Sequence, residues 1–554
     1  MSSYLDLLEK EEKYRLAEQT ELLSALLSNP SKGKLSILRR AGLAMTGLQV
    51  IGKGSGSGGR IVIELGPSVA SLPVSEDSGT GNKCKFGCFK AGEIVKIIVN
   101  NQLLSCYGTI ERRPKSSNGE ISFSLSNNVE TEELELLTEG STKISIIKVF
   151  DEVGVFEKMK ANIEAVLKDD GESGDLSKFI KDVICNLSTK TTTTTADITE
   201  AMEGLELLPE SCHLNKEQEL AVKKSLEMVQ DAKKKLILIH GPPGTGKTSV
   251  LIEIIKNIPK NMKILILGPS NLSVDNIVER LLTSNDAAGL LRIGHPSRVL
   301  ESCLRSTLDF WSENCDEGKL LKDVQKEIEN LVKNQLPKCK NREERRAIYG
   351  ELKLLRQERR KREKTLQSDL IKRARIVVCT LSTACGKKLK GLKFDLAVID
   401  EAGQALLPET LIAPILADKL ILAGDHFQLP PTVMNPEIKD KLEISLFEHL
   451  IKRRNGKDEE CDEVMLKEQY RMNEKIMRWS NKKFYGNQLR AHESVKDWEL
   501  DATDEDLKDI LIFYDTCGFD LWESVEKSTV SDNKKGLVLV EGKCHDMVIY
   551  YKHF

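Results

Sequence analysis

The stretch Gly241-Pro242-Pro243-Gly244-Thr245-Gly246-Lys247-Thr248 decides the fold, because it matches the phosphate-binding loop pattern G-x-x-x-x-G-K-[ST]. The apolar run before it, residues 235–240, predicts a short buried strand. The run after it, residues 249–255, predicts the start of a helix. A strand, a glycine-rich loop and a helix in this order predict a site for a nucleoside triphosphate.

The residue types in this loop fit phosphate chemistry. Its glycines allow the backbone to curl until several N–H groups face phosphate oxygens. Lys247 is placed to neutralise the β and γ phosphates, and Thr248 to hold Mg²⁺. The nucleotide-binding positions predicted from the loop are Gly241, Gly244, Thr245, Gly246, Lys247 and Thr248.

A second half of an ATP site is expected further along the chain. The apolar run 396–399 predicts a strand that ends in Asp400 and Glu401. Asp400 would hold Mg²⁺ through water, and Glu401 would orient the attacking water or accept its proton. A strand that merely ends in surface acids is the alternative, and the position downstream of the phosphate loop favours the functional interpretation.

Composition sets outer limits on the class of protein. The 554 residues suffice for three or four domains, and the net charge of −3 excludes a global basic bias towards nucleic acid. The 13 cysteines are scattered, which indicates a reducing compartment rather than a disulfide framework. Cys84 and Cys88 lack a second pair of metal ligands nearby and are taken as ordinary barrel cysteines. Neither a secretory signal nor a membrane-spanning run is present, so we expect a soluble intracellular protein without a membrane partner.

The chain before residue 200 changes pattern three times. Leucines at helical spacing predict an amphipathic helix over residues 4–28, and helical periodicity returns over residues 151–185. A threonine-rich, low-complexity linker follows at residues 188–195. Between the helices, short β-type runs separated by glycine-, serine- and asparagine-rich turns predict a small barrel. These runs are Leu48–Val50, Arg60–Leu65, Ile94–Val99, Gly108–Arg112, Ile121–Leu125 and Ile144–Val149, with residues 52–59 as a flexible hairpin tip.

A basic helical segment interrupts the predicted ATPase domain. Leucines and isoleucines at helical spacing mark residues 320–331 and 342–370. Between Lys338 and Arg375 there are 15 Lys and Arg residues against 6 Asp and Glu, a local net charge of +9. Two interpretations carry about equal weight: a solvated helical hairpin, or a surface that contacts a phosphate backbone.

The phosphate loop alone also fits AAA+ ATPases, but the blocks that follow it do not. In chain order, they resemble superfamily-one helicases of the up-frameshift type. The three deciding blocks are Asp400-Glu401-Ala402-Gly403-Gln404, residues 422–431 (LAGDHFQLPP) and Gln469-Tyr470-Arg471-Met472. Further blocks that resemble the family are residues 214–218, 268–276, 291–296, 377–380, 476–480 and 485–489. The resemblance covers most of the chain, with specific motifs from about residue 210 to 490.

The resemblance implies an α/β fold: a RecA-like P-loop NTPase core with an N-terminal small β-barrel on a helical stalk and a helical insertion. The implied divisions are 1–33 (stalk helix), 34–150 (barrel, domain 1B), 151–204 (stalk helix and linker), 205–299 with 371–450 (RecA-like domain 1), 300–370 (basic insertion, domain 1C) and 451–554 (incomplete RecA-like domain 2).

The resemblance also implies roles for single residues. Gln218 would read the adenine edge, whereas Gln404 and Gln428 would sense the γ-phosphate. Tyr470 would stack on the base, and Arg471 would act as an arginine finger on the γ-phosphate. Taken singly, the three residues implied to touch a nucleic-acid backbone would be read as helix caps or turns. These are Ser270, Asn271 and Thr380.

The function implied is an ATP- and Mg²⁺-dependent helicase that moves 5′ to 3′ on single-stranded RNA or DNA. A monomer in the cytoplasm and nucleus is expected, with association with ribonucleoproteins or ribosomes. The family's Gln-Gly-x-Glu and Thr-Arg-Ala-Arg blocks are not found in residues 472–554, so we expect a second RecA-like domain that is incomplete. The alternative is therefore a module that binds ATP and nucleic acid with little helicase activity. An AAA+ remodelling ATPase, which would assemble as a ring, disagrees with the order of the blocks.

Overall fold

The computed structural model describes the part of the chain that holds the predicted motifs. These residues are 2–27, 44–55, 61–67, 89, 93–99, 102–112, 121–125, 143–149, 153–167, 175–185, 214–284, 287–335, 338, 341–453 and 461–499. The predictions for Cys84 and Cys88, for the threonine-rich linker and for the end of the chain lie outside them. In the described part, no helix combines the length and apolarity that crossing a membrane requires.

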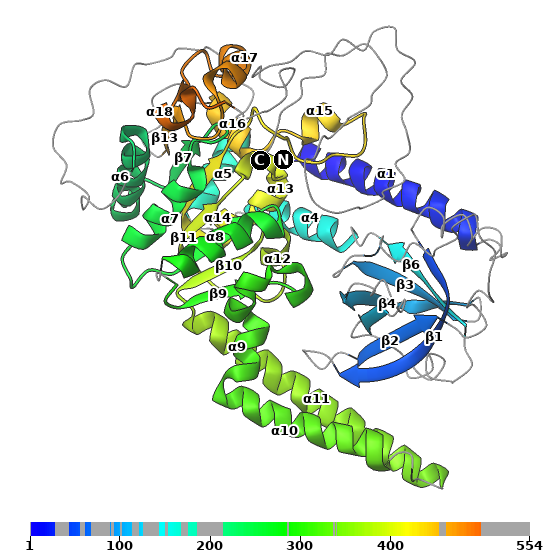
Figure 1. Ribbon diagram of the computed structural model, residues 1–554. Helices are drawn as coiled ribbons and strands as arrows, with labels where there is room; N and C mark the ends of the chain where they lie inside the picture. Colours follow the sequence, from blue (N-terminus) through cyan, green and yellow to red (C-terminus); the bar gives the residue numbers. More distant parts are fainter. Residues whose placement is uncertain are drawn as a thin grey trace.

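A closed barrel of six antiparallel strands forms the N-terminal part, as predicted (Figure 1). Around the barrel the strands run in the order β1-β2-β5-β4-β3-β6. Their bounds are Ala44–Ser55 (β1), Ile61–Pro67 (β2), Ile94–Val99 (β3), Gln102–Arg112 (β4), Ile121–Leu125 (β5) and Ile144–Val149 (β6). Residues 52–55, predicted as part of a flexible tip, instead pair with β2, because ladder hydrogen bonds need only backbone groups.

Three helices connect the barrel to the rest of the molecule. They are α1 (Ser2–Leu27), α4 (Val153–Leu167) and α5 (Asp175–Cys185). Tyr4 and Leu8 of α1 and Phe156 of α4 are buried in the same apolar cluster as the large sheet. The Glu11 carboxylate of α1 also accepts hydrogen bonds from the backbone N–H groups of Met434 and Asn435, at 2.8 and 3.0 Å. The barrel is thus held through helices that dock on the domain that contains the large sheet.

The largest described domain, the sheet domain, is built on a parallel sheet of seven strands in the order β13-β7-β12-β11-β8-β10-β9. The strands are β7 (Leu236–His240), β8 (Ile264–Gly268), β9 (Leu290–Ile293), β10 (Ile376–Thr380), β11 (Phe394–Ile399), β12 (Ala417–Gly424) and β13 (Cys461–Met465). Parallel strands are covered on both faces, which explains why β7, β8 and β10 are uninterrupted apolar runs. Because β13 joins this sheet, the sheet extends past residue 450, where the sequence placed a domain boundary.

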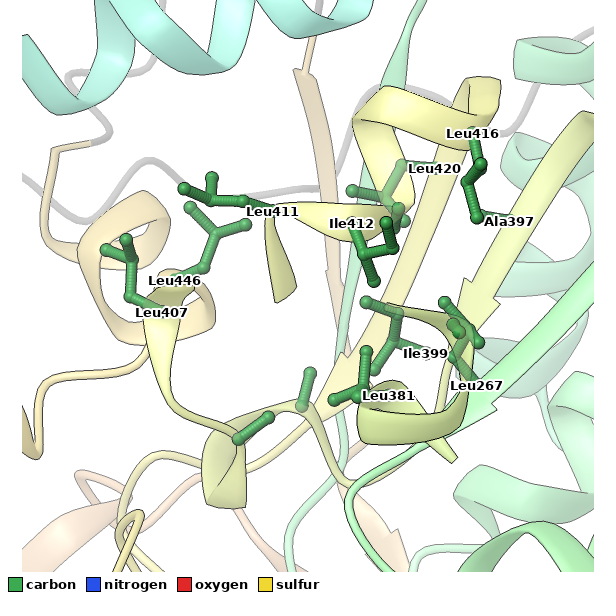
Figure 2. Packing of buried hydrophobic residues seen from close by; sticks show 14 of the residues in the cluster. Leu267, Leu381, Ala397, Ile399, Leu407, Leu411, Ile412, Leu416, Leu420 and Leu446 are labelled. Atoms are coloured by element: carbon green, nitrogen blue, oxygen red, sulfur yellow. The ribbon is translucent and has the colours of Figure 1, made fainter. Parts of the chain in front are cut away.

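Helices cover both faces of the sheet, and alternate side chains of each strand enter different clusters. Leu265 and Leu267 of β8 face the cluster that includes α4, α5 and α16, whereas Ile264 and Ile266 face the cluster that includes α6, α7 and α8. Figure 2 shows part of the first cluster, in which Leu407, Leu411 and Leu446 lie together and Ile412 lies beside Leu420 and Ile399 of the sheet. The helices are α6 (Lys216–Gln230), α7 (Lys247–Asn257), α8 (Asn271–Thr283), α12 (Leu381–Ala384), α13 (Leu407–Thr410), α14 (Ile412–Leu416), α15 (Lys439–Leu442) and α16 (Leu446–Arg453).

A helical hairpin projects from the sheet domain between β9 and β10 (Figure 1). It consists of α10 (Asp316–Asn330) and α11 (Arg342–Arg373), with α9 (Leu308–Asn314) at its base. Its own apolar cluster is small: Ile328, Leu331 and Leu352 are buried, and partly buried side chains flank them. Most of the other described side chains of the hairpin are exposed.

A small unit follows β13. It contains β14 (Glu468–Gln469), α17 (Glu474–Phe484), β15 (Arg490–Ala491) and α18 (Glu493–Lys496). β14 and β15 form a two-stranded parallel sheet, and Met477, Tyr485 and Leu489 form the unit's own buried cluster. In Figure 1, α17 and α18 lie above the ends of β7 and β13.

Candidate nucleotide and nucleic-acid site

The phosphate loop lies where β7 ends and α7 begins. Gly244 and Gly246 have φ angles of +77° and +80°, a region that side chains other than glycine rarely adopt. The backbone N–H of Gly241 donates to Gly424 O at 3.0 Å, which ties the loop to β12. The buried Lys247 side chain curls back through the loop and donates from Nζ to Gly241 O at 2.8 Å. The strand, loop and helix predicted from the sequence are therefore all present.

Acidic residues from the end of β11 face the loop. Thr248 Oγ1 lies 3.5 Å from Asp400 Oδ2, and Lys247 Nζ lies 3.8 Å from Glu401 Oε1. Burial, and then the neighbouring Glu401 charge, raise the pKa of Asp400 to about 6. Glu401 has a φ of +54°, a left-handed conformation that is uncommon outside glycine. The two halves of the predicted ATP site thus meet at the carboxyl edge of the sheet, where β7 and β11 end on either side of β12.

The residues present fit a magnesium-bound nucleoside triphosphate. A Cβ at Gly241 would lie 2.0 Å from the Lys247 side chain, so this turn of the loop has room only for glycine. A hydroxyl and a carboxylate, the donor set of Thr248 and Asp400, are oxygen ligands of the kind that Mg²⁺ prefers. Bound Mg²⁺ would offset charge on the phosphate oxygens.

Gln218 lies directly against the loop. It belongs to the first turn of α6, where it forms a capping box with Asn215. Its Nε2 donates to Thr245 O at 3.0 Å, and a Cβ at Gly246 would approach that nitrogen to 2.6 Å. The side chain is 5% exposed. Gln218 therefore supports the phosphate loop from the side of α6.

Tyr470 and Arg471 also lie against the loop. The backbone N–H of Tyr470 donates to Gly244 O at 2.9 Å, and a Cβ at Gly244 would lie 2.5 Å from the Cβ of Arg471. The Tyr470 ring is 4.6 Å from the ring of His492, and its hydroxyl contacts Asn215 at 3.0 Å. Both side chains are exposed beside the loop. The chain order alone indicated Arg471, and its position next to Gly244 emerges only from the structure.

The two predicted γ-phosphate sensors are held by acidic neighbours. Gln404 Nε2 donates to Glu401 Oε2 at 3.2 Å. Gln428 Nε2 donates to Asp425 Oδ2 at 2.7 Å. Both amides are therefore hydrogen-bonded to acidic residues that border the nucleotide site. Both side chains are partly exposed, so these hydrogen bonds rather than burial hold them in place.

Asp425 is a buried residue whose role the sequence analysis did not single out. His240 Nε2 lies 3.0 Å from Asp425 Oδ1, and Tyr485 donates its hydroxyl to Oδ2 at 2.8 Å. These donors, with Gln428, lower the pKa of Asp425 to about 2 although burial opposes the shift. His240, Asp425 and His426 could geometrically group around a metal ion, but the hydrogen bonds already occupy the Asp425 lone pairs. The only sequence signal was that Asp425 lies in one of the family-like blocks.

The three predicted nucleic-acid contacts lie at the carboxyl edge of the sheet. Ser270 caps α8 by accepting from Ser273 N at 3.1 Å, and Thr380 caps α12 by accepting from Thr383 N at 3.3 Å. Since β8 and β10 pair in parallel, both caps end up side by side at the same edge. Each backbone N–H group at such a helix start can face an anionic oxygen.

Asn271, the third predicted contact, instead has a structural partner. Its Oδ1 accepts from Arg292 Nη2 at 3.0 Å, and Arg292 Nε also donates to Asp275 Oδ1 at 2.7 Å. Arg292 and Asp275 are 0% and 1% exposed. This buried ion pair joins β9 to α8. It was not predicted, because a lone Arg within an apolar run gives no sign of its partner.

A cavity connects this edge to the stalk helices α1 and α4. Ser270, Ser382 and Gln404 line it from the sheet domain, and Arg15 and Phe156 line it from the stalk. The cavity also includes residues beyond β12, such as Leu429, which is 71% exposed. The edge that carries the predicted backbone contacts is therefore open rather than packed.

Comparisons with known proteins agree with this geometry. Models described as AAA domain match residues 213–436 and 442–549. DNA polymerase alpha-associated DNA helicase A of Schizosaccharomyces pombe is 32% identical over 496 residues, which cover 87% of this chain and 70% of that protein. The protein of the same name in Saccharomyces cerevisiae is 40% identical over 329 residues, or 54% of this chain and 47% of that protein.

DNA-binding protein SMUBP-2 of Mus musculus is 30% identical over 513 residues, which cover 90% of this chain and 48% of that protein. The chain thus spans about half the length of SMUBP-2. The resemblance to up-frameshift-type helicases, inferred from the order of the blocks, is confirmed, and an AAA+ remodelling ATPase is not supported. The chain belongs to the superfamily-one ATP-dependent helicases that include SMUBP-2.

Proposed function

We propose that the chain couples Mg²⁺-dependent ATP hydrolysis to 5′-to-3′ movement along single-stranded RNA or DNA. The observation that carries the proposal is the meeting of Lys247, Asp400, Glu401 and Arg471 around one phosphate loop. These residues supply the cation, the metal ligand, the base and the second cation that phosphoryl transfer to water requires. Association with ribonucleoproteins and a monomeric state remain predictions from the resemblance.

Each residue has a separate step in the proposed hydrolysis. Lys247 would leave Gly241 O for the β and γ phosphates, while Thr248 and Asp400 hold Mg²⁺. Glu401 would orient the attacking water and accept its proton. Arg471 would offset charge that develops on the γ-phosphate. Gln218 would read the adenine base beside the loop.

The strand would run along the carboxyl edge of the sheet. Support comes from the paired helix starts at Ser270 and Thr380 and from the open cavity beside them. Gln404 lines that cavity and also contacts Glu401, so it would link strand and nucleotide. On the nucleotide side, the exposed ring of Tyr470 would stack on the adenine base of ATP, since stacking needs only a π-face.

The first test is ATPase activity of the 554-residue chain with and without single-stranded RNA or DNA, beside Lys247→Ala. Strand-stimulated hydrolysis that Lys247→Ala abolishes is the expected result. Unwinding of duplexes with a 5′ or a 3′ tail then tests polarity, and we expect activity only on the 5′-tailed substrate. Strand binding without hydrolysis would contradict the proposal and leave an ATP- and nucleic-acid-binding module.

A further inference from the structure

One buried carboxylate fastens three separate elements at the nucleotide site. Asp425 follows β12 and is 2% exposed. Its Oδ1 accepts from His240, the last residue of β7 before the phosphate loop, and from the backbone N–H of Phe427 at 3.1 Å. Its Oδ2 accepts from the Gln428 amide at 2.7 Å and from the Tyr485 hydroxyl at 2.8 Å. Any rotation of this carboxylate therefore changes its hydrogen bonds to all of these groups.

Tyr485 reaches this carboxylate from the small unit that follows β13. It caps the C-terminus of α17 and is 5% exposed. Its ring packs edge-on against Phe427, with centroids 5.5 Å apart, and its apolar neighbours are Met477 and Leu489 of the same unit. The hydroxyl points away from those neighbours and into the sheet domain. A tyrosine buried in this way has a polar tip with one specific partner.

We propose that Tyr485 is a positioning residue that transmits the state of the phosphate loop to α17 through Asp425. The inference rests on the proposed function, because a nucleotide must occupy the loop. Gln428 and Tyr485 donate to the same oxygen, Asp425 Oδ2. When the Gln428 amide turns to a γ-phosphate, Oδ2 retains only the Tyr485 hydroxyl as a side-chain donor, and the carboxylate shifts on its remaining bonds to His240, Phe427 and Tyr485. By reciprocity, the position of α17 also biases nucleotide affinity.

The test is hydrogen exchange of peptides that cover residues 474–487 in the 554-residue chain, with and without a magnesium-bound non-hydrolysable ATP analogue. In the unaltered chain, the analogue should change exchange in α17. Tyr485→Phe keeps the ring and removes only the hydroxyl. We expect this variant to bind the analogue within about twofold of the unaltered affinity and to lose at least about four-fifths of the exchange response.

Tyr4→Phe is the matched control. Tyr4 also buries its hydroxyl in a bond between distant segments, 2.6 Å from His449 Nε2, but it lies on the stalk helix α1. This control should keep the full exchange response. The inference is overturned if the unaltered chain binds the analogue without any response in α17, if Tyr485→Phe responds fully, or if both variants lose the response alike. Failure of the unaltered chain to bind the analogue at all would overturn the proposed function, and this inference with it.

Discussion

The carboxyl edge of the parallel sheet and the α10–α11 hairpin use charge in opposite ways. At the edge, Lys247, Asp400 and Asp425 are at most 9% exposed, and each has a partner at hydrogen-bond distance. On the hairpin, the Arg362–Glu358 ion pair spans 2.6 Å, yet its side chains are 53% and 48% exposed. Buried groups depend on specific partners held in place by the fold, whereas exposed charges act together and are screened by salt. The edge is thus suited to chemistry, and the hairpin to a diffuse electrostatic contact.

The largest effect is expected from Lys247→Ala. Its ammonium is the buried cation nearest to Glu401 and the predicted γ-phosphate position, so strand-stimulated ATPase activity should fall by about 10³-fold. Steady-state phosphate release measures it. Lys256→Ala, on the exposed last turn of the same helix α7, is the control and should stay within about twofold. Comparable losses of ATPase activity in both variants would mean that the buried charge of Lys247 matters no more than an ordinary surface charge.

A substitution in the buried Arg292–Asp275 ion pair tests whether specific buried partners stabilise the folded sheet domain. Arg292→Leu leaves Asp275 buried without its cation, so the free energy of unfolding should fall by about 3–5 kcal/mol. Urea denaturation followed by tryptophan fluorescence measures the loss. Adding Asp275→Leu should recover part of it, because the unpaired charge is then removed.

The matched ion pair on the hairpin is Lys319 with Asp316, in which Lys319 Nζ lies 2.7 Å from Asp316 Oδ1. Lys319 and Asp316 are 69% and 92% exposed. Lys319→Ala should not change the urea midpoint measurably. A loss as large as that of Arg292→Leu would show that the contrast between the edge and the hairpin is wrong.

The hairpin should instead respond to the number of charges removed. Helix α11 carries 12 Lys and Arg residues against 6 Asp and Glu, whereas α10 carries 3 against 5. Changing the exposed Arg360, Lys361 and Lys364 together to Gln should weaken single-strand binding about tenfold and reduce the salt slope by about two. Fluorescence anisotropy at several salt concentrations measures both.

A matched variant on α10 removes the same number of positive charges from a different helix, so it tests whether the position of the charges matters for binding. Lys319, Lys322 and Lys326 are also three exposed cations, but they lie on the helix with an acidic excess. Changing these three to Gln should alter binding by less than about twofold. Equal effects of the two triple variants would favour the other interpretation of the basic segment, a solvated hairpin without a nucleic-acid role.

The sequence predicted those features that are local in the chain. The phosphate loop, the strand before Asp400 and the α/β fold class follow from short patterns, because neighbouring residues form them. The partners of Asp425 and Arg292 were not predicted, since a buried polar group is satisfied by whichever segment the tertiary fold brings near. For the same reason, the addition of β13 to the sheet could not be seen from its own five residues.

Glu409 is a half-buried carboxyl whose surroundings also come from the tertiary fold, and it offers the smallest predicted effect. It lies in α13 and lines the cavity at the edge, where burial raises the pKa of its carboxyl to about 7, against opposition from the Arg15 and Lys158 charges. Between about pH 4.5 and 7 the folded state holds a proton that the unfolded state releases. The free energy of unfolding should therefore fall as pH rises through this window and level off above pH 7. We expect a fall of about 1 kcal/mol, below the roughly 3 kcal/mol of the full pKa difference, because the carboxyl is partly exposed to solvent. Urea midpoints measured every half pH unit should lose this slope in Glu409→Gln and keep it in a control at an exposed hairpin acid, Glu317→Gln. An unchanged slope in Glu409→Gln would mean that this carboxylate is solvated through the cavity and that the edge is more open to water than its other buried charges indicate.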